Sequence, residues 1–104
     1  MALSFENIWN RVRNELQKGQ VIKNWGNARG FSGNTFKIVE INENKVVCKP
    51  PNAKNLQIVP KDDFKKVFEI WPKYFLGNYP RYQIRDEVTR YSSYIISIFK
   101  YLAI

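Results

Sequence analysis

The sequence has no histidine and a single cysteine, Cys48. Without histidine, the chain cannot build a Ser-His-Asp or Cys-His catalytic centre, and it lacks the usual general acid near neutral pH. One cysteine can form neither an internal disulfide nor a cysteine-rich zinc site. These absences exclude several enzyme classes, and we expect the protein to bind no cofactor and no metal.

Long hydrophobic runs are also missing from the sequence. The longest apolar-rich stretch, residues 91–104, contains three serines and a lysine and is shorter than the ~20 residues of a membrane helix. The first residues turn polar at Glu6, so they do not form the apolar segment of a secretory signal. We therefore expect a cytoplasmic protein of a prokaryote, or of a virus that infects one, with no membrane partner.

What the chain does contain is an ordinary globular mixture. Hydrophobic residues make up 44% of the sequence and charged residues 25%, which argues against intrinsic disorder. A length of 104 residues predicts one domain that spans residues 1–104. Aromatic residues are abundant at 15% and can supply both a core and stacking surfaces.

Hydrophobic periodicity in the first part of the chain predicts one helix followed by a small sheet. Residues 4–18 carry apolar side chains at helical spacing, with Ser4 as the N-cap. Glycines at three positions predict a polar loop over residues 26–34. Strands are expected at residues 35–41, 45–49 and 56–60, with 21–25 as a candidate fourth.

The second part of the chain reads as helical. A helix over residues 62–71 is predicted to start at Asp62 as its N-cap and to stop before Pro72. After an irregular connection over residues 78–85, a last helix should begin near Asp86. Because that helix is apolar most of the way round, it should form the centre of the core, which favours a monomer over a homodimer.

The predicted fold is therefore α+β, in the order α-β-β-β-α-α. An antiparallel meander of three strands should pack its apolar face against the helices. Trp9 and Trp71 each complete a helical apolar stripe, so we expect both to be buried.

The charge balance points to a function. The formal net charge is +8, and residues 21–60 hold six basic residues against two acidic ones. Because Lys45 and Lys49 share strand parity, we expect Lys45, Lys49 and Lys54 to lie on or beside one exposed face. A nucleic acid is bound largely by cations that neutralise its phosphates, so we interpret this region as a phosphate-binding surface formed by Lys23, Arg29, Lys37, Lys45, Lys49 and Lys54. The alternative is that the surplus lysines only keep the protein in solution.

Two aromatic segments extend this interpretation. The glycine-rich segment offers Phe31 for stacking on a base, whereas we expect Trp25 to fold back into the core. The connection after residue 77 combines tyrosine with arginine, a pairing that suits either nucleic acid or a protein interface. It contributes two candidate stacking residues and two candidate phosphate contacts: Tyr79, Tyr82, Arg81 and Arg85.

The carboxylates do not predict a catalytic site. Asp62-Asp63 and Asp86-Glu87 are adjacent pairs at expected helix starts, where acidic residues interact favourably with the helix dipole. Glu40 has no upstream aspartate with which to hold a metal ion, and Cys48 should pack as a small apolar residue. We therefore expect no enzymatic activity, and a metal-dependent nuclease fragment is the least favoured alternative.

Part of the second half also resembles a known kind of module. The pattern lies within residues 62–102, under half of the chain, and comprises Asp63-Phe64, Val67, Trp71, Tyr74, Gly77, Arg81 and Ser92-Ser93-Tyr94-Ile95-Ile96-Ser97-Ile98. It resembles a small module of uncharacterised prokaryotic proteins, some of which occur in nuclease or restriction contexts. The resemblance implies a shared fold, and no catalytic residue is carried over from it.

Together these features predict a small, non-enzymatic domain that binds DNA or RNA. Its lysine-rich sheet and its glycine- and aromatic-containing loops would hold the phosphate backbone. The alternative is a protein-interaction module, such as an accessory or inhibitor protein of a defence system or mobile element, with a host or operon protein as its partner.

Overall fold

The computed structural model describes residues 4–26 and 30–104, apart from the side chain of Arg81. Its sheet is an antiparallel meander in the order β1-β2-β3-β4, so the predicted α+β class and the candidate fourth strand are both confirmed. The elements in chain order are α1 (Phe5–Glu15), β1 (Val21–Gly26), β2 (Gly30–Ile41), β3 (Lys45–Lys49), β4 (Gln57–Pro60), α2 (Lys61–Phe75), the short α3 (Arg81–Gln83), the π-helix η1 (Ile84–Val88) and α4 (Ser92–Tyr101).

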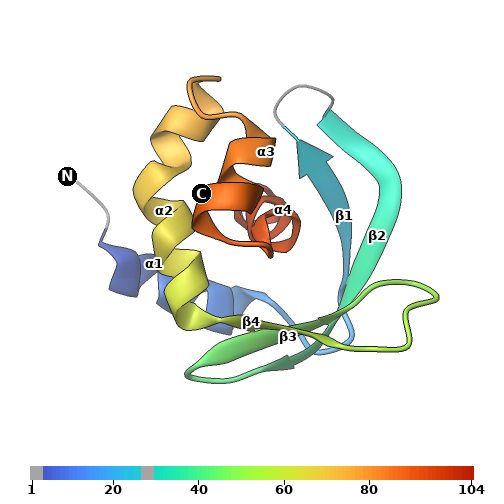
Figure 1. The fold of residues 1–104 in the computed structure, drawn as a ribbon. Coiled ribbons are helices and arrows are strands. Elements are labelled where there is room, and N and C mark those ends of the chain that lie inside the picture. Colours follow the sequence, from blue (N-terminus) through green and yellow to red (C-terminus); the bar gives the residue numbers. More distant parts are fainter. Residues whose placement is uncertain (1–3, 27–29) are drawn as a thin grey trace.

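The sheet bends around α4 (Figure 1). The β1–β2 hairpin rises on one side of this helix, β3 and β4 lie below it, and α1 and α2 close the opposite side. The strand register shifts at two places, between Lys23 and Trp25 in β1 and between Ile38 and Glu40 in β2. Such bulges increase strand twist and bend, which allows so few strands to wrap around one helix.

The glycine-rich segment is less of a loop than predicted. The expected loop over residues 26–34 is wrong at Gly26, which ends β1, and for residues 30–34, because β2 already begins at Gly30; residues 27–29 lie outside the described residues. Gly30 pairs with Gly26, and Phe31 pairs with Trp25 across the β1–β2 hairpin. Hydrogen bonds between the strands thus keep this segment in an extended conformation, although its glycine content locally favours a loop.

The first two helices follow their apolar stripes with small differences at the ends. Ser4 caps α1 as predicted, since its hydroxyl accepts from the Asn7 N–H at 3.2 Å. The expected Asp62 cap of α2 is wrong, because α2 starts one residue earlier after Pro60, and Asp62 lies in its first turn. The helix also continues through Pro72 to Phe75. Proline removes one N–H donor, and burial of Trp71 and Tyr74 on the same helix offsets that loss.

The largest difference from the predicted secondary structure lies just before α4, where a single helix was expected to begin near Asp86. The chain instead forms α3 and then η1, where the Thr89 N–H donates to the Ile84 carbonyl at 2.9 Å in the spacing of a π-helix. Thr89 then adopts an extended conformation, with φ of −160° and ψ of 140°. Its hydroxyl donates to Asp63 of α2 at 2.9 Å. This tertiary contact separates η1 from α4.

Helix α4 forms the centre of the core, as its composition predicted (Figure 1). Ile95, Ile96, Ile98 and Phe99 all have no exposed surface, whereas Tyr101 at the end of the helix is 47% exposed. Trp9 and Trp71, which are 2% and 7% exposed, are also buried as predicted.

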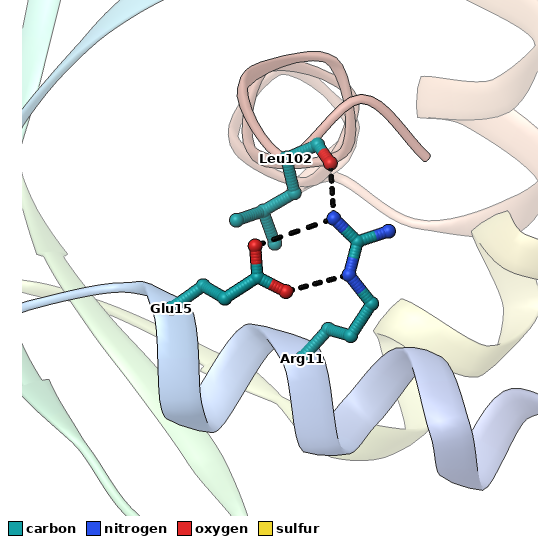
Figure 2. A network of polar contacts seen from close by, with 3 residues as sticks. All are labelled: Arg11, Glu15 and Leu102. Atoms are coloured by element: carbon teal, nitrogen blue, oxygen red, sulfur yellow. Dashed lines mark hydrogen bonds and ion pairs between the residues drawn. The ribbon is translucent and has the colours of Figure 1, made fainter.

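A polar contact fixes the first helix to this centre. In Figure 2 the Arg11 guanidinium of α1 bridges the Glu15 carboxylate and the Leu102 carbonyl at the end of α4. The Arg11 Nε to Glu15 Oε2 distance is 2.6 Å. Through residues 4–26 and 30–104, no helix has the length and apolar character needed to cross a membrane.

Candidate nucleic-acid interface

Strand β3 separates the core from the outer surface of the sheet. Val46 and Cys48 are fully buried and point towards the helices. Because side chains alternate along a strand, Lys45, Val47 and Lys49 lie on the opposite face, where Val47 is nevertheless only 4% exposed. Lys49 is exposed and Lys45 is half-buried.

The same outer face continues onto β2 and β1. Lys37 lies between the buried Phe36 and Ile38, so its side chain is directed outwards. It is directly opposite Lys49 in the register of β2 and β3. On its other side lies Val21, two residues before the exposed Lys23 of β1. Lys23, Lys37 and Lys49 therefore occupy three adjacent strands, and we call this set the lysine face.

The lysine face carries uncompensated positive charge. The ion pairs within the described part of the chain are Arg11–Glu15, Lys61–Glu6 and Arg85–Asp86, and none includes a member of this face. Glu40 is opposite Val47 and hence diagonal to Lys49, yet it forms no ion pair among the residues with described side chains. Two lysines directly opposite each other in an antiparallel sheet also repel, which destabilises the strand pair.

The remaining predicted cations are distributed differently. Lys45 lies at the other end of β3, opposite Pro60, and Lys54 is exposed in the connection between β3 and β4. Arg85 belongs to η1, where its guanidinium pairs with Asp86 at 3.0 Å, and this hydrogen bond raises the pKa of Arg85. Arg29 lies outside the described residues, as does the side chain of Arg81. Among the six predicted cations whose side chains the structure describes, it thus brings together three.

The predicted aromatic contacts also separate into different regions. Trp25 is 8% exposed and packs in the core, as expected, whereas Phe31 opposite it is 59% exposed. Tyr82 of α3 is exposed, and the half-buried Tyr79 donates to Glu87 at 3.4 Å. Partial burial and the Glu87 carboxylate raise the pKa of Tyr79. Within the described side chains of this segment, Asp86 compensates the charge of Arg85.

The described residues contain neither a reactive cysteine nor a cluster of metal ligands. Burial raises the pKa of the Cys48 thiol to about 12, so the sulfur stays protonated and packs as an apolar group. Within the described residues, no three Asp, Glu, Cys or His side chains gather where a metal ion could be held.

One concave site was missed by sequence reasoning. A groove of about 660 Å³ lies between β4 and the start of α4, lined by Leu56, Gln57, Ile58, Arg90, Tyr91, Ser93 and Tyr94. Its two sides are far apart in the chain, and the expected helix start at Asp86 placed Arg90 and Tyr91 inside a regular helix. The sequence pattern that could have indicated this groove is the pair Arg90-Tyr91 followed by Ser93 and Tyr94.

The resemblance noted for residues 62–102 rests mainly on core positions. Phe64, Val67, Trp71 and Ile95 are all buried, so the shared pattern describes packing. The resemblance itself stays a prediction. Comparison of the chain with protein-family models, with curated proteins and with solved structures finds no match.

Proposed function

We propose that this protein is a non-enzymatic nucleic-acid-binding protein whose lysine face contacts the phosphate backbone. The observation that carries the proposal is the direct opposition of Lys37 and Lys49 on the outer face of the sheet. Such a pair costs stability in the free protein, and a bound polyanion relieves that cost while it gains two phosphate contacts. The overall charge of +8 adds long-range attraction to the same ligand.

The spacing of the lysine face supports a continuous contact with a phosphate chain. Neighbouring strands are about 4.8 Å apart, so Lys23, Lys37 and Lys49 span roughly 10 Å across the sheet. Their side chains are exposed and long enough to adjust to phosphates of either DNA or RNA. We place this activity in the cytoplasm. Because Ile96 and Phe99 are buried within one chain, it requires no second copy of the protein.

A salt titration with charge-neutralised variants tests the proposal. The test variant replaces Lys23, Lys37 and Lys49 with Gln, and a matched control replaces the exposed Lys18, Lys66 and Lys73 with Gln. Both variants lose the same net charge. For duplex DNA, loss of three phosphate contacts should make the negative slope of log K against log salt concentration shallower by about 2.7, and the control should keep most of the slope. Equal slopes in the two variants would contradict the proposal.

A protein-interaction module remains the second candidate, and one surface favours it. Phe31 and Phe75 flank Trp25 and are 59% and 47% exposed, and Leu76, which follows Phe75, is 75% exposed. Exposed apolar residues that cluster in this way are typical of protein interfaces. A salt-insensitive complex with one protein, lost on Leu76→Ser substitution, would support this function over nucleic-acid binding.

A further inference from the structure

The groove between β4 and α4 combines planar, apolar and polar walls. Its volume of about 660 Å³ lies inside the roughly 300–1,000 Å³ range of small-molecule sites. Leu56 and Ile58 form one wall and are 48% and 49% exposed, so large apolar side chains are left in contact with water. Tyr91 and Tyr94 contribute the aromatic groups of the opposite wall.

The planar groups of the groove are held in place. The Tyr94 ring meets the buried Phe36 ring edge to face, with centroids 5.0 Å apart and planes at 82°. The Arg90 guanidinium lies over the Tyr91 ring, 4.9 Å from its centroid, and donates to the Tyr91 hydroxyl at 2.8 Å. Both aromatic rings and the guanidinium plane are therefore positioned before any ligand arrives, which lowers the entropy cost of stacking.

The polar groups of the groove are mostly unengaged. Within the described part of the chain, the side chains of Gln57 and Ser93 make no hydrogen bond, and Arg90 has no carboxylate partner. None of the residues described as lining the groove is acidic. An amide, a hydroxyl and a guanidinium without a carboxylate partner, beside aromatic rings, are complementary to a planar group with polar edges and a nearby negative charge.

The groove opens at the margin of the lysine face. Ile58 lines the groove and is directly opposite Val47. Val47 lies on the outer side of β3, two residues before Lys49. The β4 wall of the groove is therefore paired with the strand that carries Lys49.

From this arrangement we propose that the groove binds one nucleotide of a single-stranded nucleic acid, with its base against Tyr91 and Tyr94 and its phosphate near Arg90. The proposal rests on the proposed function, because the lysine face holds the neighbouring phosphates. It adds a preference for single strands, since a base can enter the groove only when it is unpaired.

Three DNA probes test the groove separately from the lysine face. They are a short single-stranded oligonucleotide, the same sequence as a duplex, and a single strand with abasic sites, which keeps the phosphates. The Tyr91→Leu variant retains an apolar side chain but loses the planar ring. It should weaken binding of the intact single strand by roughly 10-fold and leave binding of the duplex and the abasic strand unchanged.

A second variant keeps the test valid if Tyr91→Leu unfolds. The exposed Arg90→Gln should weaken binding of the intact single strand more than the exposed Arg13→Gln, a control with the same change in charge. Equal weakening for all three probes, or none, in folded Tyr91→Leu would overturn base binding, and an effect of Arg90→Gln no larger than that of Arg13→Gln would overturn the phosphate contact in the groove, while the triple lysine variant still supports the proposed function. A wild-type protein that binds none of the probes would overturn both proposals.

Discussion

Lys37 and Lys49 provide a perturbation whose effects on stability and on binding have opposite signs. Directly opposed residues in an antiparallel pair have Cβ atoms about 4.5–5.5 Å apart, and opposite charges there gain roughly 0.2–1 kcal/mol. The Lys37→Glu substitution removes a repulsion and creates an attraction. We expect it to raise the free energy of unfolding by about 0.5–1 kcal/mol, which for a chain of this size raises Tm by roughly 2–8 °C.

Thermal unfolding followed by circular dichroism measures this effect. The Lys37→Gln variant is the matched control, because it removes the repulsion without a new attraction and should give an intermediate Tm. Repeating the melts in about 1 M salt, where the Debye length is about 3 Å, should remove most of the gain. A lower Tm for Lys37→Glu at low salt would contradict the register of β2 and β3.

Nucleic-acid affinity should change in the other direction. Each lysine removed from a phosphate contact lowers the salt slope by about 0.9, and the carboxylate that Lys37→Glu introduces also repels the backbone. Lys37→Glu should therefore bind more weakly than Lys37→Gln, which binds more weakly than the wild type. A variant that is more stable yet binds nucleic acid as well as the wild type would refute the role of the lysine face.

Two further predictions concern the core. Trp71→Ala removes a buried ring that packs on Phe99 and whose indole N–H donates to the Ile104 carbonyl at 2.9 Å, so it should cost about 3–5 kcal/mol in urea unfolding; a wild-type midpoint would contradict this packing. For Cys48, burial raises the folded-state pKa from 9.0 to about 12, so its contribution to stability is complete below pH 9 and is lost as the pH rises towards 12. The free energy of unfolding should therefore fall by up to about 1.4 kcal/mol per pH unit above pH 9, and Cys48→Ala should have a shallower dependence.

The parts of the fold that sequence predicts well are those fixed by local periodicity. The stripe of Ile8, Trp9 and Val12 defines the inner side of α1, and Val46 and Cys48 define the inner side of β3. The start of α4 could not be predicted in this way. Asp86 and Glu87 have the composition of a helix start, and the hydrogen bond from Thr89 to Asp63 joins residues that are distant in sequence.

In the candidate site, too, some features follow from local sequence patterns and others depend on contacts between distant segments. Strand parity places Lys45 and Lys49 on one side of β3, which follows from the alternation of side chains alone. The opposition of Lys37 and Lys49 depends on the bulge between Ile38 and Glu40, whose position no sequence pattern marked. The groove likewise needs β4 and α4 to meet, so its residues belong together only in three dimensions.

The central position of α4 determines when the core can form during synthesis of the chain. Of the described elements, α4 is the last to leave the ribosome, yet its Ser97 hydroxyl accepts from the Trp25 N–H at 3.0 Å and its end accepts from Arg11. Until residues 92–102 emerge, the inner face of β1, including Ile22, lacks the helix that packs on it. We therefore expect the nascent chain to expose a chaperone-binding apolar surface and to complete its core only after α4 has been synthesised.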